Sequence, residues 1–259
     1  MSNGTSKQPF EFYPDRFFRV SPTWNSWVKI RAADVHALRE VPDNFRTPRR
    51  TYFHLNHPIR FVRLVGPIVA IDDINSWLTT FTIDDGSGAT IEVAVRRLSS
   101  DITDAIDCPS NTVVDNVHVD SRLGVFDLRV DETVLDIGTV VNIKCTLTNY
   151  RKMMQLELQR VKIVRDTTEE ARAWGELADF YETVLGKPWV VTAEDVRAIE
   201  KEERREAREV REKERKLKER NEKKKVWKER HEERMKVHEE KLERRRKREE
   251  DKLMVGALV

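Results

Sequence analysis

The strongest constraint on the fold comes from three short apolar segments between residues 59 and 98, separated by two polar turns. The first segment, 59–71, is interrupted by Gly66 and Pro67, the second covers 77–83, and the third, 90–98, alternates apolar and polar side chains. Alternation at a period of two indicates a half-buried strand, and a glycine within a long strand marks a sharp bend. The pattern predicts one long bent strand followed by two shorter strands in a tight hairpin.

Two more strands are predicted at residues 139–147 and 153–164, joined by the loop 148–152. The connection 99–138 is expected to carry a helix or extra strands. This layout is typical of the OB-fold, a five-stranded barrel. The predicted fold class is β + α: a five-stranded OB-fold barrel with flanking N-terminal and C-terminal helices and a long charged helical tail.

Helical patterns flank the predicted barrel on both sides. Residues 24–38 have a short helical pattern, and residues 167–186 form a second, capped by Thr167 or Thr168. A capping-box sequence at 192–195 then opens a helix that continues to about Asp251. We therefore expect three regions: a disordered N-terminus at 1–11, an OB-fold domain with its flanking helices at 12–189, and a long charged single helix at 190–259.

Charge is distributed unevenly along the chain. Residues 201–250 contain 23 basic and 16 acidic residues, whereas residues 1–200 contain 24 basic and 29 acidic residues. A net acidic domain does not bind DNA by charge alone, because counterion release requires clustered Lys and Arg. Any nucleic-acid contact of the barrel is therefore expected to be local or shared with a partner.

No catalytic or metal-binding pattern is evident. The two cysteines, Cys108 and Cys145, lack the spacing of a metal site or disulfide framework, and His54 and His57 lack further ligands nearby. No Ser-His-Asp, Cys-His or paired-carboxylate arrangement is present. No run of 18 apolar residues occurs. We expect a soluble, non-enzymatic protein without cofactor, metal or membrane contact.

An OB-fold presents its second and third strands, with two flanking loops, to a bound single strand. The outward positions on those strands are predicted to be polar and to lack an aromatic stacking platform. The loop 149–152 instead offers one ring and two cations. The predicted nucleic-acid contacts are Trp77, Thr80, Thr82, Arg96, Arg97, Tyr150, Arg151 and Lys152. The alternative is that the loop residues are only solvated.

The helical pattern after the barrel carries an apolar stripe that is wider than packing on the barrel requires. We predict that this stripe binds a partner subunit, and the alternative is that it packs on its own barrel. Further along, the heptad frame is interrupted by Glu203 and Lys224, which favours a single helix over a coiled coil. The predicted partner-interface residues are Ala171, Trp174, Leu177, Ala178, Tyr181 and Leu185.

Several segments point to a family, most specifically Asn56-His57-Pro58-Ile59 and the turn from Ile83 to Gly88. Together with YFHLNHPIRFVRLVGPIVAIDD and FTIDDGSGATIEV, they resemble the middle subunit of the CST telomere-capping complex. This is the "suppressor of cdc thirteen" family in its filamentous-fungal form. The resemblance covers about residues 12–189.

The resemblance implies a non-catalytic subunit that binds single-stranded telomeric DNA and caps telomeres within a replication-protein-A-like heterocomplex. It implies a nuclear location at the telomeric region of chromosomes. The implied partners are the small OB-fold subunit, the large subunit, the telomeric single strand and DNA polymerase alpha-primase. It also supports Arg96, Tyr150 and Arg151 as DNA contacts.

The sequence shows one departure from the family and leaves two alternative functions open. Several relatives contact the polymerase machinery through tandem winged-helix domains, but the tail at 190–259 is too charged to form such a core. Polymerase stimulation by that route is therefore not expected. The function could instead be that of a general replication-protein-A-like middle subunit in replication and repair. A further alternative is an RNA-binding OB-fold protein.

Overall fold

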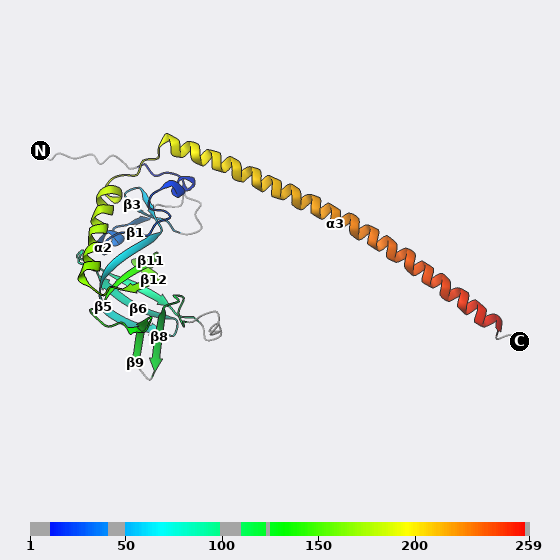
Figure 1. The fold of residues 1–259 in the computed structure, drawn as a ribbon, viewed down its shortest axis with the longest axis horizontal. Coiled ribbons are helices and arrows are strands. Elements are labelled where there is room, and N and C mark those ends of the chain that lie inside the picture. Colours follow the sequence, from blue (N-terminus) through cyan, green and yellow to red (C-terminus); the bar gives the residue numbers. More distant parts are fainter. Residues whose placement is uncertain (1–10, 41–49, 99–109, 123–124, 257–259) are drawn as a thin grey trace. The chain divides into compact units, whose positions relative to one another are not determined.

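The computed structural model describes residues 11–40, 50–98, 110–122 and 125–256 (Figure 1). The chain divides into two units, residues 1–196 and 197–259, which are considered separately. The disorder expected at 1–11 falls almost entirely outside the described residues. Among the described residues, no helix is both long and apolar enough to cross a membrane.

A closed five-stranded barrel forms the core of the first unit. β5 pairs with β6 and with β11, β6 pairs with β7, β7 runs parallel to β12, and β12 returns antiparallel to β11. This order is that of an OB-fold, so the predicted fold class is confirmed. The five strands are β5 (Phe61–Asn75), β6 (Leu78–Asp84), β7 (Thr90–Arg96), β11 (Val140–Tyr150) and β12 (Met153–Ile163).

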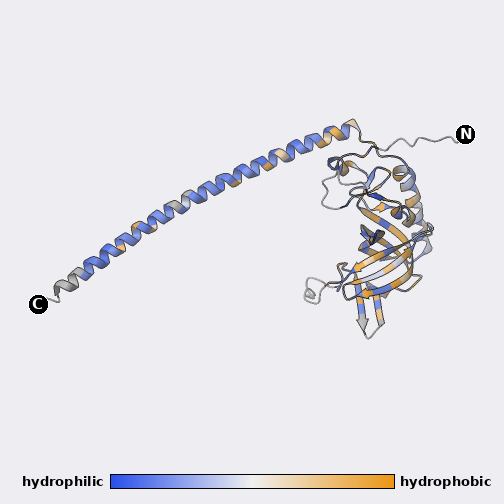
Figure 2. Ribbon diagram, turned by 180° about the vertical axis from the view of Figure 1, so that it is seen from behind, coloured by the Kyte–Doolittle hydropathy of each residue, from blue (hydrophilic) through white to orange (hydrophobic). Residues whose placement is uncertain are grey.

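The barrel interior follows the predicted alternation along the strands. The inward side chains of the second and third barrel strands are all buried, and the strands alternate in hydropathy (Figure 2). Burial of these aliphatic and aromatic side chains supplies the main driving force for closure. The inward residues of these strands include Phe81, Ile83, Ile91, Val93 and Val95.

β5 closes the barrel because its first half pairs with one neighbouring strand and its second half with another. Its residues from Phe61 to Pro67 pair with β11, and those from Ile68 onward pair with β6. At the change of partner, a Cβ on Gly66 would lie 2.4 Å from the carbonyl oxygen of Asp84. Only glycine allows this approach, which explains the predicted bend.

The segment before the barrel differs from the prediction of a helix over residues 24–38. It forms β1 (Val28–Lys29), which pairs in parallel with β5, and only the short helix α1 (Ala32–His36). Val28 and Ile30 are buried while the residue between them is half-buried, which is the period of a strand. The helical interpretation was wrong for most of this segment because it ignored pairing with a distant strand.

α1 begins where the turn between β6 and β7 supplies its caps. The backbone N–H of Ala32 donates to Oδ2 of Asp85 at 2.7 Å, and that of Ala33 donates to Oγ of Ser87 at 3.1 Å. These acceptors satisfy amide groups that a helix N-terminus leaves without partners. The turn therefore holds α1 against the barrel.

Additional strands surround the barrel. The connection 99–138 contains a separate three-stranded sheet of β8 (Val117–Arg122), β9 (Val125–Val130) and β10 (Thr133–Val134), whereas residues 99–109 and 123–124 lie outside the described residues. A second small sheet joins β2 (Arg39–Glu40), β3 (Tyr52–His54) and β4 (His57–Ile59), and a 3-10 helix, η1 (Asp15–Val20), precedes β1. The expectation of extra strands is confirmed.

After the barrel, helix α2 (Thr167–Phe180) continues into a π-helical turn, η2 (Tyr181–Leu185). Asp166, rather than Thr167 or Thr168, caps α2, because its carboxylate accepts the N–H of Glu169 at 2.7 Å. Gly186 ends the π turn by donating its N–H to the carbonyl of Tyr181.

The segment that follows is fastened to the β3–β4 turn. The amide of Asn56 accepts the N–H of Trp189 and donates to the carbonyl of the same residue, both at 2.7 Å. Next to it, Nε2 of His57 lies 2.8 Å from the carbonyl of Lys187, and burial lowers the pKa of His57. These contacts fix the chain between α2 and the next helix.

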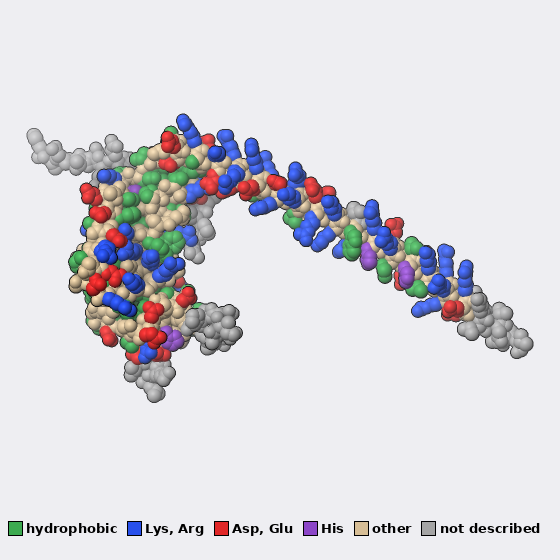
Figure 3. All heavy atoms as spheres, viewed as in Figure 1, with side chains coloured by type: hydrophobic (Ala, Val, Ile, Leu, Met, Phe, Trp, Pro, Cys, Tyr) green, Lys and Arg blue, Asp and Glu red, His purple; other side chains and the backbone are tan. Residues whose placement is uncertain are grey.

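The last helix is α3 (Ala193–Gly256), and it is the long helix expected from the sequence. Thr192 and Asp195 exchange the reciprocal hydrogen bonds of the predicted capping box, at 3.0 Å and 3.2 Å. Cationic and acidic side chains alternate along its surface (Figure 3), with ion pairs between residues four apart, such as Glu212 and Lys216 at 2.7 Å.

Replacing Gly66 with alanine should lower the free energy of unfolding by about 2–3 kcal/mol, because the added methyl group cannot fit beside the Asp84 carbonyl. Urea unfolding monitored by circular dichroism measures the change. Gly175→Ala in α2 is the matched control: nothing lies within 4 Å of its Cβ, so it should be neutral or stabilising by up to about 1 kcal/mol. Equal midpoints for Gly66→Ala and the parent would contradict this account of closure.

Candidate nucleic-acid interface

The tip of the β11–β12 hairpin presents one aromatic ring beside two cations. Tyr150 is 56% exposed, and the guanidinium of Arg151 lies 5.2 Å from the centre of its ring. Lys152 is exposed and donates its backbone N–H to Oδ1 of Asn149 at 3.0 Å. Among the described residues, neither cation of this tip has an ion-pair partner. The tip can therefore offer a stacking surface together with two positive charges.

The turn at this tip is conformationally unfavourable. Arg151 and Lys152 both have positive φ, at 50° and 68°. A two-residue turn of this kind favours Asn and Gly, and a left-handed residue with a side chain costs about 1–2 kcal/mol. Two large cations therefore occupy positions where the backbone alone would favour other residues, which is consistent with a surface function.

The outer face of β6 and β7 is less accessible than predicted. Thr80 is only 2% exposed and its neighbour Ala94 only 5%, so Thr80 cannot contact a ligand directly. Thr82 is half-buried. Arg96 is exposed, and its Nε lies 2.6 Å from Oε1 of Glu157. The middle of this face is therefore covered at Thr80 and Ala94, whereas Thr82 and Arg96 remain accessible.

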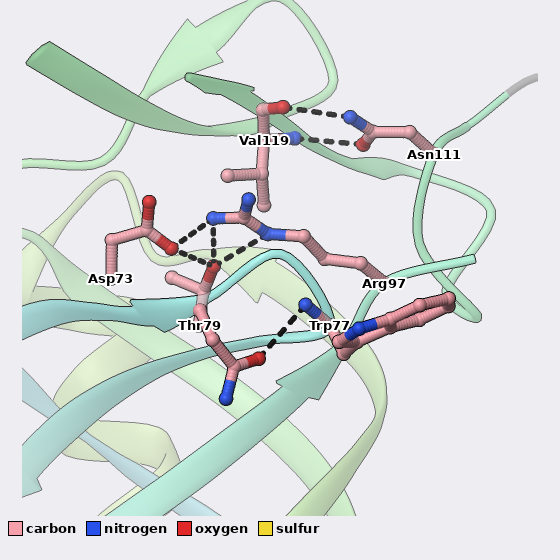
Figure 4. Close-up of polar contacts among 7 residues, drawn as sticks. Asp73, Trp77, Thr79, Arg97, Asn111 and Val119 are labelled. Atoms are coloured by element: carbon pink, nitrogen blue, oxygen red, sulfur yellow. Dashed lines mark hydrogen bonds and ion pairs between the residues drawn. The ribbon is translucent and has the colours of Figure 1, made fainter. Parts of the chain in front are cut away.

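Arg97 is engaged inside the protein, as Figure 4 shows. Its guanidinium pairs with the carboxylate of Asp73 and donates from Nε to the hydroxyl of Thr79 at 3.0 Å. The side chain is 9% exposed. Contrary to the prediction, Arg97 is not available to a phosphate; it connects the end of β5 to β6.

Trp77 lies in the β5–β6 turn and is 58% exposed. The β6–β7 register places this turn beside Arg96, at the end of β7. Tyr150 pairs with Met153, and the parallel pairing of β7 with β12 places Met153 beside Thr90, at the start of β7. Thr90 and Arg96 are six residues apart on β7, and a rise of about 3.3 Å per residue separates them by about 20 Å. Trp77 and Tyr150 therefore mark opposite ends of the β7 face and do not form one cluster.

An aromatic and cationic cluster at the start of β5 was missed by the sequence analysis. The rings of Trp27 and Phe61 are 4.9 Å apart, Nζ of Lys144 lies 5.6 Å from the Trp27 ring, and the Arg60 guanidinium lies 4.7 Å from the Phe61 ring. The helical interpretation of residues 24–38 concealed it. The alternation of Val28 and Ile30 was the signal that would have placed Trp27 on the outer face.

The stripe on α2 divides between solvent and core. Four of its six residues are exposed, with Trp174 at 53%, and Leu177 is half-buried. Leu185 is fully buried in the protein's own core, so the prediction that it contacts a partner was wrong. The wider π turn changes the angular spacing after Tyr181 and directs Leu185 inward. The exposed members are Ala171, Trp174, Ala178 and Tyr181.

Glu176 fastens the other side of α2 to the barrel. Its Oε2 lies 2.6 Å from Nη1 of Arg63 and 3.2 Å from Nζ of Lys29. The hydrogen bond from Arg63 is the main reason why the pKa of Glu176 is lowered. Beside these contacts lies a groove of about 390 Å³ that Trp174 and Leu177 line. The helix is thus held by an ion pair while Ala171, Trp174 and Ala178 of the stripe are exposed, and the Tyr181 ring lies 5.1 Å from the Arg31 guanidinium.

The closed barrel, the cationic hairpin tip and the exposed residues on α2 define an OB-fold protein with a helix packed after its last strand. Residues 4–245 match the family described as telomere regulation protein Stn1. The chain belongs to this family.

The chain is also similar to individual proteins and solved structures. Protein stn1 of Schizosaccharomyces pombe is 26% identical over 153 residues, covering 59% of this chain and 38% of that protein. The chain thus matches about two fifths of the relative's length. A crystal structure of yeast Stn1 and Ten1 has a TM-score of 0.50 at 14% identity, covering 74% of this chain and 91% of that one. The S. pombe Stn1–Ten1 complex has a TM-score of 0.42 at 22% identity, covering 61% and 92%.

Replacing the turn residues by Arg151→Asn with Lys152→Gly should raise the free energy of unfolding by about 1 kcal/mol, because these residues tolerate positive φ. Thermal unfolding of the full chain measures the effect. Arg151→Ala with Lys152→Ala removes the same charges without relieving the backbone and should not be stabilising. If both double variants were equally stable, charge rather than backbone conformation would be the cause.

Proposed function

We propose that the chain is a non-catalytic subunit that binds single-stranded telomeric DNA and caps chromosome ends within a replication-protein-A-like heterocomplex in the nucleus. Membership of the Stn1 family supports the telomeric role. The observation that carries the DNA-binding role is the exposed Tyr150 ring beside Arg151 and Lys152, at a loop position that OB-folds use for single strands.

A small OB-fold subunit is the proposed partner of α2. The exposed aromatic side chains of Trp174 and Tyr181 are of the kind that dominate protein interfaces. The yeast Stn1 structure with a similar fold was solved with Ten1, which supports a partner of that kind. The large subunit and DNA polymerase alpha-primase are proposed as further partners on family membership alone.

The charge distribution supports weak DNA binding by the barrel alone and tighter binding in the assembly. Residues 1–200 are net acidic, so the field over the barrel as a whole opposes a polyanion. The hairpin tip provides only two uncompensated cations and one ring. Binding surface from partner subunits would add to this local contact.

Tyr150→Ala with Arg151→Ala should weaken binding of a G-rich single strand by the assembled complex about 5- to 150-fold, because one stacked base contributes about 1–3 kcal/mol. Fluorescence anisotropy with a labelled oligonucleotide measures this loss. Tyr150→Phe keeps the ring and should bind like the parent. Unchanged affinity of the double variant in the intact complex would refute this assignment.

Trp174→Ala with Tyr181→Ala should abolish copurification of the small subunit while the barrel stays folded, because each truncated aromatic removes about 2 kcal/mol or more from an interface. Coexpression, followed by size-exclusion chromatography and circular dichroism, tests both parts.

Leu185→Ala is the contrasting control on the same helix. Leu185 is fully buried, so its truncation should lower the stability of the free chain by about 2–5 kcal/mol. If the Trp174 and Tyr181 variant lost the barrel fold as well, the exposed stripe would be part of the core rather than an interface.

A further inference from the structure

A groove of about 850 Å³ lies between the outer face of the β11–β12 pair and the segment that leads into β5. Rings of Trp24, Tyr52 and Phe61 line it together with Thr146 and Thr148 of β11, and Thr146 is the cross-strand neighbour of Phe61. Its volume is in the range of sites that take small organic groups. The groove is on a different part of the barrel from the β6–β7 face.

One cation without a carboxylate partner lines this groove, and two more lie on the adjoining strands β11 and β12. Arg60 lines it, and Lys144 projects from the same face of β11 as its threonines. Arg160 is the direct cross-strand partner of Lys144 and is exposed. In the described part of the chain, none of these three cations has a carboxylate partner. Like charges opposite each other on neighbouring strands are destabilising, so an anionic ligand would relieve this pair.

The carboxylates near the groove are already neutralised. Glu157 lines it but pairs with Arg96 at 2.6 Å. Arg50, at the rim, pairs with Glu40 at 3.4 Å. The groove therefore keeps a local positive charge although residues 1–200 are net acidic. This charge favours a polyanion over a neutral or cationic ligand.

The rings are arranged for stacking beside those cations. Trp24, Trp27 and Phe61 are each half-buried, and the Arg60 guanidinium lies 4.7 Å from the Phe61 ring and 5.9 Å from the Trp24 ring. Aromatic rings next to guanidinium groups form the stacking platforms on which proteins hold unpaired bases. An acidic peptide would use the cations but would gain little from the ring faces.

The groove continues to the hairpin tip along a single strand. Lys144, Thr146, Thr148 and Tyr150 alternate on β11 and share its outer face, a path of about 20 Å. A bulge opposite this path makes Gln159 the extra residue, and Gln159 lines the groove. Bulges re-aim side chains, here toward the groove.

We propose that this groove is a second single-strand subsite, in which bases stack on Trp24 and Phe61 and phosphates contact Arg60, Lys144 and Arg160. A bound strand runs from the Tyr150 tip along the outer face of β11 into the groove. This inference rests on the proposed single-strand binding and extends it to a face that OB-folds are not expected to use.

The test compares oligothymidylates of about six and about eighteen nucleotides on the full chain, within and beyond the site size of one OB-fold. Arg60→Gln with Lys144→Gln should lower the affinity for the long oligonucleotide about tenfold. It should also reduce the slope of the affinity against salt concentration by the amount expected for the loss of about two phosphate contacts. Binding of the short oligonucleotide, which the Tyr150 tip can hold, should change little. Tyr150→Ala should weaken both.

Arg165→Gln with Arg172→Gln is the charge-matched control, since both arginines are exposed and neither lines the groove. This control should bind both oligonucleotides like the parent. Equal binding of the long oligonucleotide by the groove variant and the parent would overturn the subsite and leave the proposed function intact. Failure of the parent to bind either one would instead count against the proposed function. Binding of a polyglutamate peptide that depends on Arg60, with no effect on the long oligonucleotide, would assign the groove to an acidic protein segment.

Discussion

The barrel depends on one long strand that pairs with two different strands and so closes the sheet on itself. β5 pairs with β11 over its first half and with β6 over its second, and the change of partner occurs where Gly66 meets the Asp84 carbonyl. That contact sets the register of β6 and β7, and through them the distance between the Trp77 turn and the Tyr150 tip. The close packing of the Gly66 backbone against the Asp84 carbonyl, which only a residue without a side chain allows, thus helps to determine where the Trp77 and Tyr150 rings lie.

Internal pairing decides which of the many cations can act at the surface. Arg97 is held by Asp73, and Arg63 by Glu176, so both serve the fold. The cations at the hairpin tip, and Arg60, Lys144 and Arg160 in or next to the groove beside β11, have no such partners among the described residues. A barrel with net negative charge can therefore present positive patches, because its acidic side chains neutralise selected cations rather than all of them.

The fold was predictable where the local sequence pattern favoured the same structure as the contacts with distant parts of the chain. Alternating side chains and polar turns located the barrel strands, and Gly66 located the bend. The segment around Val28 was mispredicted because its strand exists only beside β5 and its short helix is capped by Asp85 from another turn. Thr80 and Arg97 were expected at the surface because strand parity does not reveal what covers a face or which carboxylate lies nearby. Exposure of Tyr150 and Trp174 agreed with the predicted positions because each projects from a hairpin tip or a helix face.

The π turn after α2 has a consequence for how this family can diverge. Because the turn rotates Leu185 into the core while Trp174 and Tyr181 remain outside, the residues that anchor the helix and those that face outward are different residues. Substitutions on the outer stripe can then accumulate together with changes in a binding subunit without loosening the helix. Leu185, in contrast, can change only together with the barrel core that surrounds it. Covariation across orthologues should therefore separate these two groups, although they are neighbours on one helix.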